Sequence, residues 1–173
     1  MAHSATPAAM PPPARPHGSR RWRALVGFLA VSYGVAALGA LASADAGEVY
    51  AALARPAWAP PAWLFGPVWT VLYGMMAIAA WLVERQPNRL RVRRAHMWWS
   101  VQVTLNLAWT PLFFAARRYG LALLDIVLLL AALATTVVLF RRLSRTAALL
   151  LVPYLLWVCF ATVLNAAIWQ LNP

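Results

Sequence analysis

Long runs of apolar residues, separated by short polar segments, dominate the chain. Five such runs stand out, at about residues 24–44, 64–83, 95–115, 121–140 and 146–169. Each is close to the roughly 20 residues that a helix needs to cross a hydrocarbon core of about 30 Å. The pattern therefore predicts an all-α integral membrane protein built as a bundle of five transmembrane helices.

The residues before the first run differ in character. Residues 1–23 are rich in Pro, Ala and Arg, and we expect them to be disordered because they offer little apolar side-chain area to bury. The run at 24–44 has three interpretations: a retained transmembrane helix, a removed signal peptide suggested by residues 19–21 and 42–44, or an arginine-rich transit segment. We prefer a retained helix, because about 20 residues exceed the roughly 7–15 of a signal-peptide core.

The amino-acid composition is typical of a membrane protein, and it changes how the net positive charge is interpreted. The chain is 63% hydrophobic and 11% charged, with a mean hydropathy of +0.66, whereas soluble domains are about a quarter charged. The net charge is +11, and in a soluble protein this excess would suggest nucleic acid. Here the arginines lie between apolar runs, so we expect contact with the lipid bilayer and no nucleic-acid partner.

The arginines alternate between the two sides of the predicted bundle. Three lie on one side, Arg55, Arg117 and Arg118, and twelve lie on the other: Arg15, Arg20, Arg21, Arg23, Arg85, Arg89, Arg91, Arg93, Arg94, Arg141, Arg142 and Arg145. Cytoplasmic loops carry the excess of basic residues. We therefore expect the amino terminus in the cytoplasm, and the first loop and the carboxyl terminus on the opposite side.

Aromatic residues and prolines gather between the first and second runs. Trp58, Trp63 and Trp69 fall in the segment 56–73, where Pro60 and Pro61 hold the backbone in a stiff, non-helical path. Stiff backbone presents the indole rings in fixed places. Two interpretations remain open: an aromatic belt at the membrane surface, or the cover of a pocket for a flat ligand.

Polar side chains inside the apolar runs need a reason, because they are costly in lipid. Gln102, Asn106 and Trp109 share one face of the third run, and the fifth run has a comparable face, formed by Tyr154, Trp157, Ala161 and Asn165. Such faces point to the bundle interior. Hydrogen bonds between helices and contact with a ligand are both consistent with them.

Reactive groups are sparse in the sequence. Asp125 lies near the start of the fourth run, and we expect it to be a structural anchor paired with Arg117 or Arg118. No nucleophile with a base, no phosphate-binding loop and no set of metal ligands is visible in the sequence. The sequence therefore favours a protein that is not an enzyme and requires no metal or cofactor.

Several motifs together resemble one known family. They are residues 56–63 leading into 65–73, residues 106–114, Asp125, residues 152–157 and residues 161–165. In order and in spacing these segments resemble the TspO/MBR family, which includes bacterial tryptophan-rich sensory proteins and the mitochondrial translocator protein, or peripheral benzodiazepine receptor. The resemblance covers about residues 25–169 and assigns 24–173 to one membrane domain.

The resemblance implies a five-helix bundle, a homodimer and an internal pocket that the first loop covers as a lid. It implies porphyrin or haem-like tetrapyrrole ligands, with sterols and benzodiazepine-type compounds as further ligands. A sterol motif at the end of the last helix is doubtful, because residues 164–170 lack its Tyr and basic residue. The implied ligand-binding residues are Trp58, Trp63, Trp69, Tyr73, Asn106, Trp109, Tyr154, Trp157, Ala161 and Asn165.

Three functions are compatible with this resemblance, in a protein that we expect in a bacterial cell membrane. The first is a receptor or carrier that binds porphyrins, with a role in tetrapyrrole transport or stress regulation. The second is an enzyme that degrades porphyrin in light through Trp69 and Trp157. The third is a stress-related scaffold. We favour the first, because the sequence indicates a pocket but no catalytic constellation.

Overall fold

The computed structural model describes residues 17–173, and every regular element in that range is helical. The helices are α1 (His17–Leu41), α2 (Ala46–Ala52), α3 (Phe65–Glu84), α4 (Arg89–Thr110), α5 (Tyr119–Arg141) and α6 (Arg145–Leu171). A 3-10 turn, η1 (Ala62–Leu64), leads into α3, and a π-helical segment, η2 (Pro111–Ala115), continues α4. The five long helices correspond to the five apolar runs.

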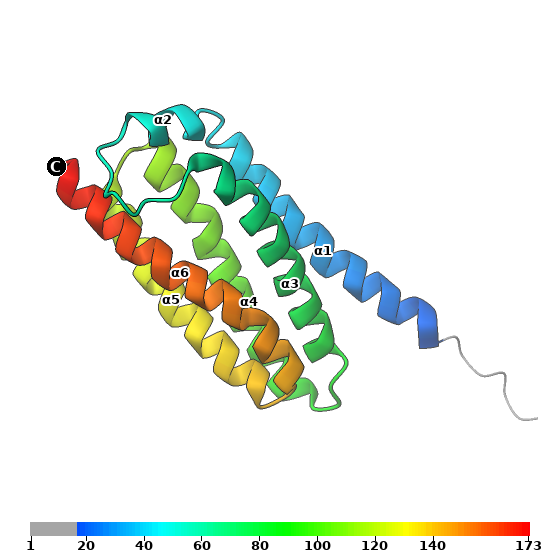
Figure 1. Ribbon diagram of the computed structural model, residues 1–173. Helices are drawn as coiled ribbons and strands as arrows, with labels where there is room; N and C mark the ends of the chain where they lie inside the picture. Colours follow the sequence, from blue (N-terminus) through cyan, green and yellow to red (C-terminus); the bar gives the residue numbers. More distant parts are fainter. Residues whose placement is uncertain (1–16) are drawn as a thin grey trace, which may run out of the picture.

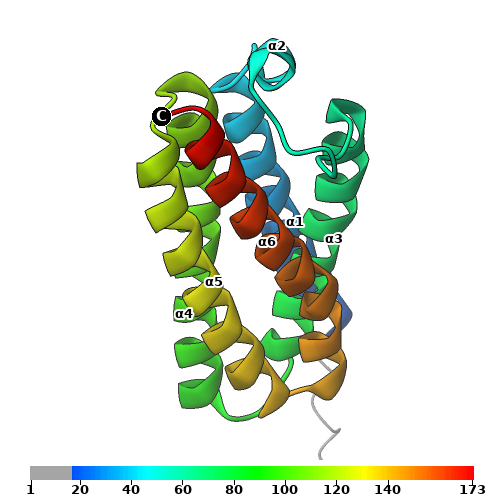
Figure 2. The ribbon, with the colours of Figure 1, turned by 60° about the vertical axis from the view of Figure 1, so that its left-hand side comes forward.

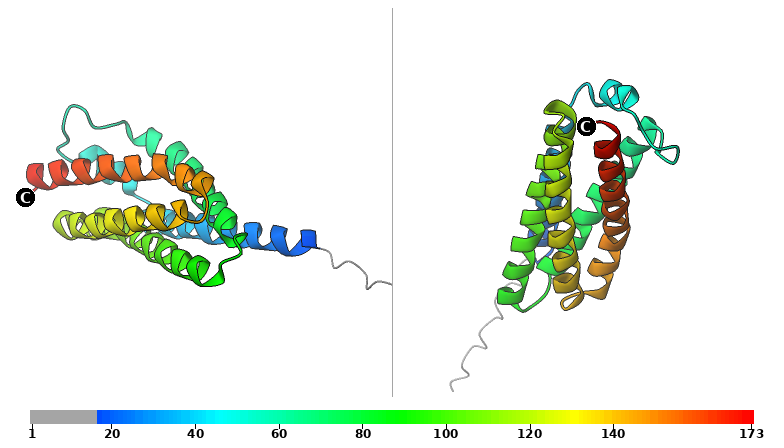
Figure 3. Two further views of the ribbon diagram at one scale, coloured as in Figure 1. Left: turned by 90° about the horizontal axis from the view of Figure 1, so that it is seen from below. Right: turned by 90° about the vertical axis from the view of Figure 1, so that its left-hand side faces the viewer.

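The long helices pack side by side around a common interior (Figure 1). Neighbouring contacts run from α1 to α3, α3 to α6, α6 to α5, α5 to α4, and from α4 back to α1. The short α2 and the loop after it lie across one end of this bundle, at the end where α6 finishes (Figure 2). The amino end of α1 extends beyond the opposite end (Figures 1 and 3).

Four of the described helical segments are long and apolar enough to cross a bilayer: Trp22–Leu41, Ala62–Glu84, Tyr119–Arg141 and Arg145–Leu171. Helix α4 is not among them, because arginines in its first two turns and the polar residues His96, Gln102 and Asn106 further along lower its mean hydropathy. Four spans are sufficient to make this an integral membrane protein.

Local sequence accounts for where the helices begin. Asn88 caps α4, because its side-chain oxygen accepts a hydrogen bond from the Arg91 amide at 3.1 Å. Ser144 caps α6 in the same way, accepting from the Ala147 amide at 3.3 Å. Pro111 ends the regular part of α4, since it lacks the amide hydrogen that the α-helical ladder needs, and the chain continues as the π-helical η2.

Two boundaries differ from those expected from the sequence. Helix α1 begins at His17, whereas residues 17–23 were expected to be disordered. The arginines there are good helix formers. The rest of that expectation concerns residues 1–16, which lie outside the described part of the chain. Within the expected first loop, the alanine-rich segment Ala46–Ala52 forms α2, which buries Val49 and Tyr50.

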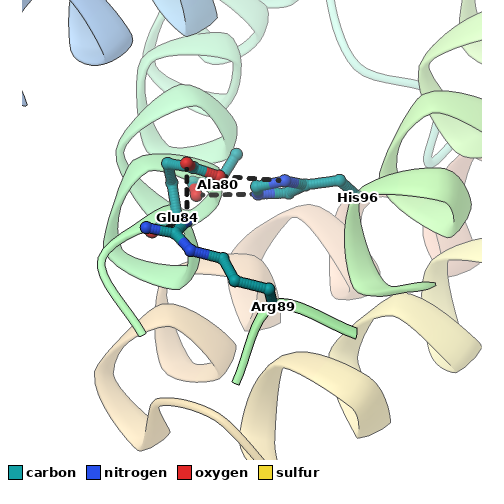
Figure 4. A network of polar contacts seen from close by, with 4 residues as sticks. All are labelled: Ala80, Glu84, Arg89 and His96. Atoms are coloured by element: carbon teal, nitrogen blue, oxygen red, sulfur yellow. Dashed lines mark hydrogen bonds and ion pairs between the residues drawn. The ribbon is translucent and has the colours of Figure 1, made fainter. Parts of the chain in front are cut away.

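The core contains small and large side chains in close contact. Ala77, Ala79 and Ala80 on α3 are fully buried, as are Met76 and Tyr154. Alanines let helix backbones approach closely, which is the packing that membrane helices favour. The ends of α3 and α4 are joined by polar contacts among Glu84, Arg89 and His96 (Figure 4). His96 also meets the Ala80 carbonyl oxygen, with Nε2 at 3.1 Å.

The expected ion pair of Asp125 is wrong. Among the described residues both ion pairs involve Glu84, and the Oδ2 atom of Asp125 is buried without a hydrogen-bond partner. Arg117 and Arg118 are exposed, and the backbone φ of Arg117 is +53°. The turn that ends η2 therefore keeps both arginines at the surface, while Asp125 faces the interior of the bundle.

Candidate functional site

A cavity of about 560 Å³ opens at the end of the bundle where α2 crosses it. Its walls come from α1, α2, η1, α3, α4, η2 and α6, and none of the described lining residues belongs to α5. The described lining side chains are aromatic, small, hydroxyl or amide groups, and none of them is ionised at neutral pH. The volume lies within the usual range of small-molecule sites, about 300–1,000 Å³.

Six of the ten predicted site residues line this cavity. They come from α3, α4 and α6 and are Trp69, Tyr73, Asn106, Trp109, Trp157 and Ala161. The spacing along each helix accounts for this, because residues at i, i+3, i+4 and i+7 share one face. The other four, Trp58, Trp63, Tyr154 and Asn165, are not part of the wall.

A chain of hydrogen bonds fixes the polar side of the wall. The Tyr73 hydroxyl donates to Oδ1 of Asn106 at 2.5 Å, and Nδ2 of Asn106 donates to the Tyr154 hydroxyl at 3.1 Å. All three residues are buried, and Tyr154 is fully so. Tyr154 therefore lies behind the wall and holds Asn106, an amide whose donor and acceptor are both in use.

Asn165 has a similar supporting position. Its Oδ1 accepts from the indole Nε1 of Trp109 at 3.0 Å, and its Nδ2 donates to the Tyr119 carbonyl at the start of α5, also at 3.0 Å. Trp109 is further packed against Phe113, with the ring centroids 4.9 Å apart. These contacts hold the Trp109 ring in one orientation at the cavity.

Trp157 differs from Trp109 and Tyr73, two other polar aromatic residues of the wall. Its Nε1 is buried and has no hydrogen-bond partner among the described residues, whereas Trp109 and Tyr73 are paired. Its ring lies 5.8 Å from Phe65 and 5.6 Å from Phe160, measured between centroids. A buried, unpaired N–H is unfavourable by about 1–3 kcal/mol, so this indole N–H does not stabilise the ligand-free fold.

The two tryptophans of the first loop lie outside the wall. Trp63 is 72% exposed, and Trp58 packs edge-on against Phe160 of α6 at 5.8 Å. Pro61 is extended, with φ −65° and ψ 147°, as the paired prolines predict. The carbonyl of Pro60 accepts a hydrogen bond from the Tyr50 hydroxyl at 2.9 Å, which connects α2 to the proline segment.

Tyr50 is a wall residue that the sequence did not single out. It lies on α2, is 3% exposed, and carries the Arg55 guanidinium over its ring, with Cζ 4.6 Å from the centroid. Burial raises the pKa of the Tyr50 phenol, and Arg55 partly opposes this rise. The phenol therefore remains neutral and can keep donating to Pro60.

Helix α1 also contributes to the wall, and this contribution was missed. Tyr33, Ala36, Gly39 and Ala40 of α1 line the cavity, together with Ser43 and Ala44 in the turn that follows it. The Tyr33 hydroxyl donates to the Thr70 carbonyl of α3 at 3.1 Å, and Gly39 faces Thr110 of α4. The recurrence of small residues in the first run was the available signal, because small side chains mark a face where helices or ligands approach.

The loop after α2 is held to the end of α6 by one side chain. The amide of Asn172 accepts from the Ala54 backbone N–H at 3.1 Å and donates to the Ala54 carbonyl at 3.0 Å. Its Nδ2 also meets the Ile168 carbonyl at 2.8 Å. Segments 118 residues apart in the chain are thereby joined across the mouth of the bundle.

Comparison with known proteins identifies one family and several of its members as similar to this chain. The family described as TspO/MBR matches residues 27–170. The tryptophan-rich protein TspO of Chlorobaculum tepidum is 44% identical over 125 residues, which cover 72% of this chain and 79% of its own. The human translocator protein is 41% identical over 125 residues, covering 71% and 74%. The tryptophan-rich sensory protein of Cereibacter sphaeroides is 36% identical over 151 residues, covering 87% and 92%.

Proposed function

The chain belongs to the TspO/MBR family, and we propose on that basis that it is a membrane receptor or carrier for porphyrins and similar flat, hydrophobic ligands. The neutral, aromatic lining of the cavity, which includes Trp69, Trp109 and Trp157, carries this proposal. Ring faces stack on a flat macrocycle, while a few polar groups of the wall fix its orientation. Relatives named translocator protein and tryptophan-rich sensory protein support a role in transport or sensing.

The test is a titration of the detergent-purified protein with protoporphyrin in the dark, followed by tryptophan fluorescence. We expect saturable binding at one site, with quenching of the wall tryptophans. Uptake that rises without saturation would show that the porphyrin only enters the detergent micelle, and the ligand assignment would then be abandoned while the fold stands.

We propose that α4 is the fifth membrane span. After its arginine-rich first turns, residues 95–115 contain no Arg, Lys, Asp or Glu, and α4 with η2 continues through this whole segment. Twenty-one helical residues extend about 30 Å, which is the thickness of a hydrocarbon core. The arginines at the start of α4 would then lie at the level of the lipid headgroups.

We also propose the orientation that the arginines favour, with the amino terminus cytoplasmic and the first loop outside, in a bacterial cell membrane. A reporter enzyme that is active only in the cytoplasm should be inactive when it is fused after Pro173. The same reporter inserted between Arg142 and Leu143, in the turn after α5, should be active. The reverse result would show that the chain has the opposite orientation in the membrane. The homodimer and the sterol or benzodiazepine-type ligands remain predictions from the family.

We propose that α2 and residues 53–61 form a lid over the cavity. Ala46, Gly47 and Tyr50 of α2 belong to the wall, so removing this segment would open it. Contacts that attach the segment to α6 include Trp58 against Phe160 and the Asn172 amide on Ala54. Tyr50, Leu53 and Ala59 also pack in one cluster with Leu164 and Ile168. Opening the lid requires these contacts to separate.

Asn172→Ala is expected to speed porphyrin dissociation about fivefold and to leave the thermal midpoint within about 2 °C of the parent. The variant loses the hydrogen bonds that hold Ala54, each with a net value of about 0.5–1.5 kcal/mol, and these bonds connect only surface segments. Stopped-flow dissociation into excess detergent measures the rate. Gln170→Ala, an exposed change on the same helix, is the control. Equal rates in the two variants would remove Asn172 from the lid mechanism.

The degradation of porphyrin in light remains the second candidate, and one observation favours it. Trp69 and Trp157 both line the cavity, so either indole could supply an electron to a bound, excited porphyrin. A defined product formed in light that disappears in Trp69→Phe or Trp157→Phe, but persists in Trp22→Phe, would identify an enzyme. Bleaching at equal rates in all three variants would be nonspecific.

A further inference from the structure

The cavity lacks any group that could neutralise an anionic ligand. Its described walls present indoles, phenols, hydroxyls and one amide, without an arginine or a histidine. An ionised carboxylate that leaves water without a cationic partner is disfavoured. A ligand carboxylate is therefore more stable outside this space, at a position where a cation can reach it.

One cation is held at the boundary of the cavity. Tyr50 lines the cavity, and the Arg55 guanidinium lies over its ring, with Cζ 4.6 Å from the centroid. The Tyr50 hydroxyl is tied to the Pro60 carbonyl at 2.9 Å, so the ring that supports Arg55 is itself fixed. Stacking on an aromatic face orders a guanidinium and leaves its N–H groups at the edge available to an oxyanion.

Arg55 has no carboxylate partner among the described residues. Both ion pairs in this part of the chain use Glu84, which lies at the other end of α3 from the first loop. Arg55 also borders a second hollow, of about 510 Å³, whose other walls are Leu53, Pro56, Ala57, Ala59, Pro60 and Pro61. Space for a ligand group is therefore present beside the guanidinium, within a segment that the prolines stiffen.

We propose that Arg55 is a carboxylate-binding subsite for the ligand of the cavity. The ligand class is then a flat, apolar ring system that carries at least one carboxylate side chain. The ring occupies the neutral cavity, and the carboxylate extends past Tyr50 to the guanidinium, where two parallel N–H···O bonds can form. This inference rests on the proposed binding function and adds the charge that the ligand must have.

The test compares protoporphyrin IX with its dimethyl ester, which has the same ring but no ionisable carboxylate. Both are titrated in the dark against the parent protein, Arg55→Gln, Arg55→Lys and Arg142→Gln in neutral detergent. Arg142 is exposed in the turn between α5 and α6, so its variant loses the same charge at the opposite end of the bundle. The thermal midpoint of each variant is measured beside the affinity.

The parent and Arg142→Gln should bind the acid about tenfold more tightly than the ester. Arg55→Gln should lose that preference by weakening the acid alone, with the thermal midpoint unchanged. Arg55→Lys should keep part of the preference, because lysine retains the charge but not the planar fork. If Arg55→Gln weakens acid and ester equally, or neither, the carboxylate subsite is overturned while saturable ester binding still supports the cavity. Failure of the parent to bind either compound would overturn both proposals.

A phospholipid headgroup offers the same oxyanion chemistry, and a second arm separates the two sources. The titrations are repeated in nanodiscs of neutral phosphatidylcholine and in nanodiscs that contain phosphatidylglycerol. A preference for the acid that depends on Arg55 in neutral lipid supports the ligand carboxylate. An effect of Arg55 that appears only with phosphatidylglycerol would assign the residue to the lipid headgroup and overturn the proposal.

Discussion

Asn106→Leu should lower the free energy of unfolding by about 2 kcal/mol, because it leaves two buried hydroxyls without partners. Tyr73 loses its acceptor and Tyr154 loses its donor, and both phenols remain enclosed by α3, α4 and α6. Leucine keeps the branching of asparagine at Cγ and is the larger side chain, so the effect does not come from a cavity. Reversible denaturation in mixed micelles, followed by circular dichroism, measures the change.

Removing the whole network should restore most of the lost stability. In the triple variant Tyr73→Phe, Asn106→Leu, Tyr154→Phe, no hydroxyl is left unpaired, and the replacement of all partners by apolar groups is often close to neutral. Thr104→Val is the matched control, since Thr104 is exposed on the same helix and bonds only within it. If the triple variant is less stable than Asn106→Leu, the orphaned hydroxyls are not the cause.

Trp157→Phe should weaken porphyrin binding about tenfold while leaving the thermal midpoint of the ligand-free protein unchanged or slightly higher. The affinity and the thermal midpoint respond differently for a physical reason. The indole N–H is buried without a partner, so removing it does not disturb the empty protein, whereas the complex loses part of the stacked area. A loss of about 1.4 kcal/mol corresponds to a tenfold change in affinity.

The control for this variant is Trp22→Phe, because Trp22 is 69% exposed on α1 and is not part of the cavity wall. Its affinity should equal that of the parent. A Trp157→Phe protein that binds porphyrin as tightly as the parent would show that the ligand does not use this indole. A lower thermal midpoint without ligand would show instead that the indole supports the fold.

The long helices were predictable because each apolar run is long enough to be read without tertiary information. The periodicity of α4 and α6 also predicted which side chains face inward. Tyr154 and Asn165 lie on the predicted inward face of α6, but they do not line the cavity. Their polar groups instead form hydrogen bonds with Asn106 and Trp109, which do line it. Sequence periodicity gives the direction of a side chain but not its hydrogen-bond partner.

Shorter structural features could not be predicted from the hydrophobic pattern. Helix α2 has seven residues, too few for a period to be recognised, and with it Tyr50 and its contact to Arg55 were missed. The expected pairing of Asp125 with Arg117 or Arg118 relied on closeness in sequence. The turn after η2, where Arg117 adopts a positive φ, decides instead where these side chains lie, and such a turn depends on packing.

The bond between Asn172 and Ala54 bears on how the protein should be prepared for measurement. A purification tag fused after Pro173 begins one residue from the side chain that holds the first loop, and a bulky or charged tag would compete for that position. Helix α1 begins at the other end of the bundle (Figure 1), so we expect an amino-terminal tag to leave this contact undisturbed. Affinities from the two preparations should therefore differ, and the amino-terminal tag is the one that preserves the closed loop.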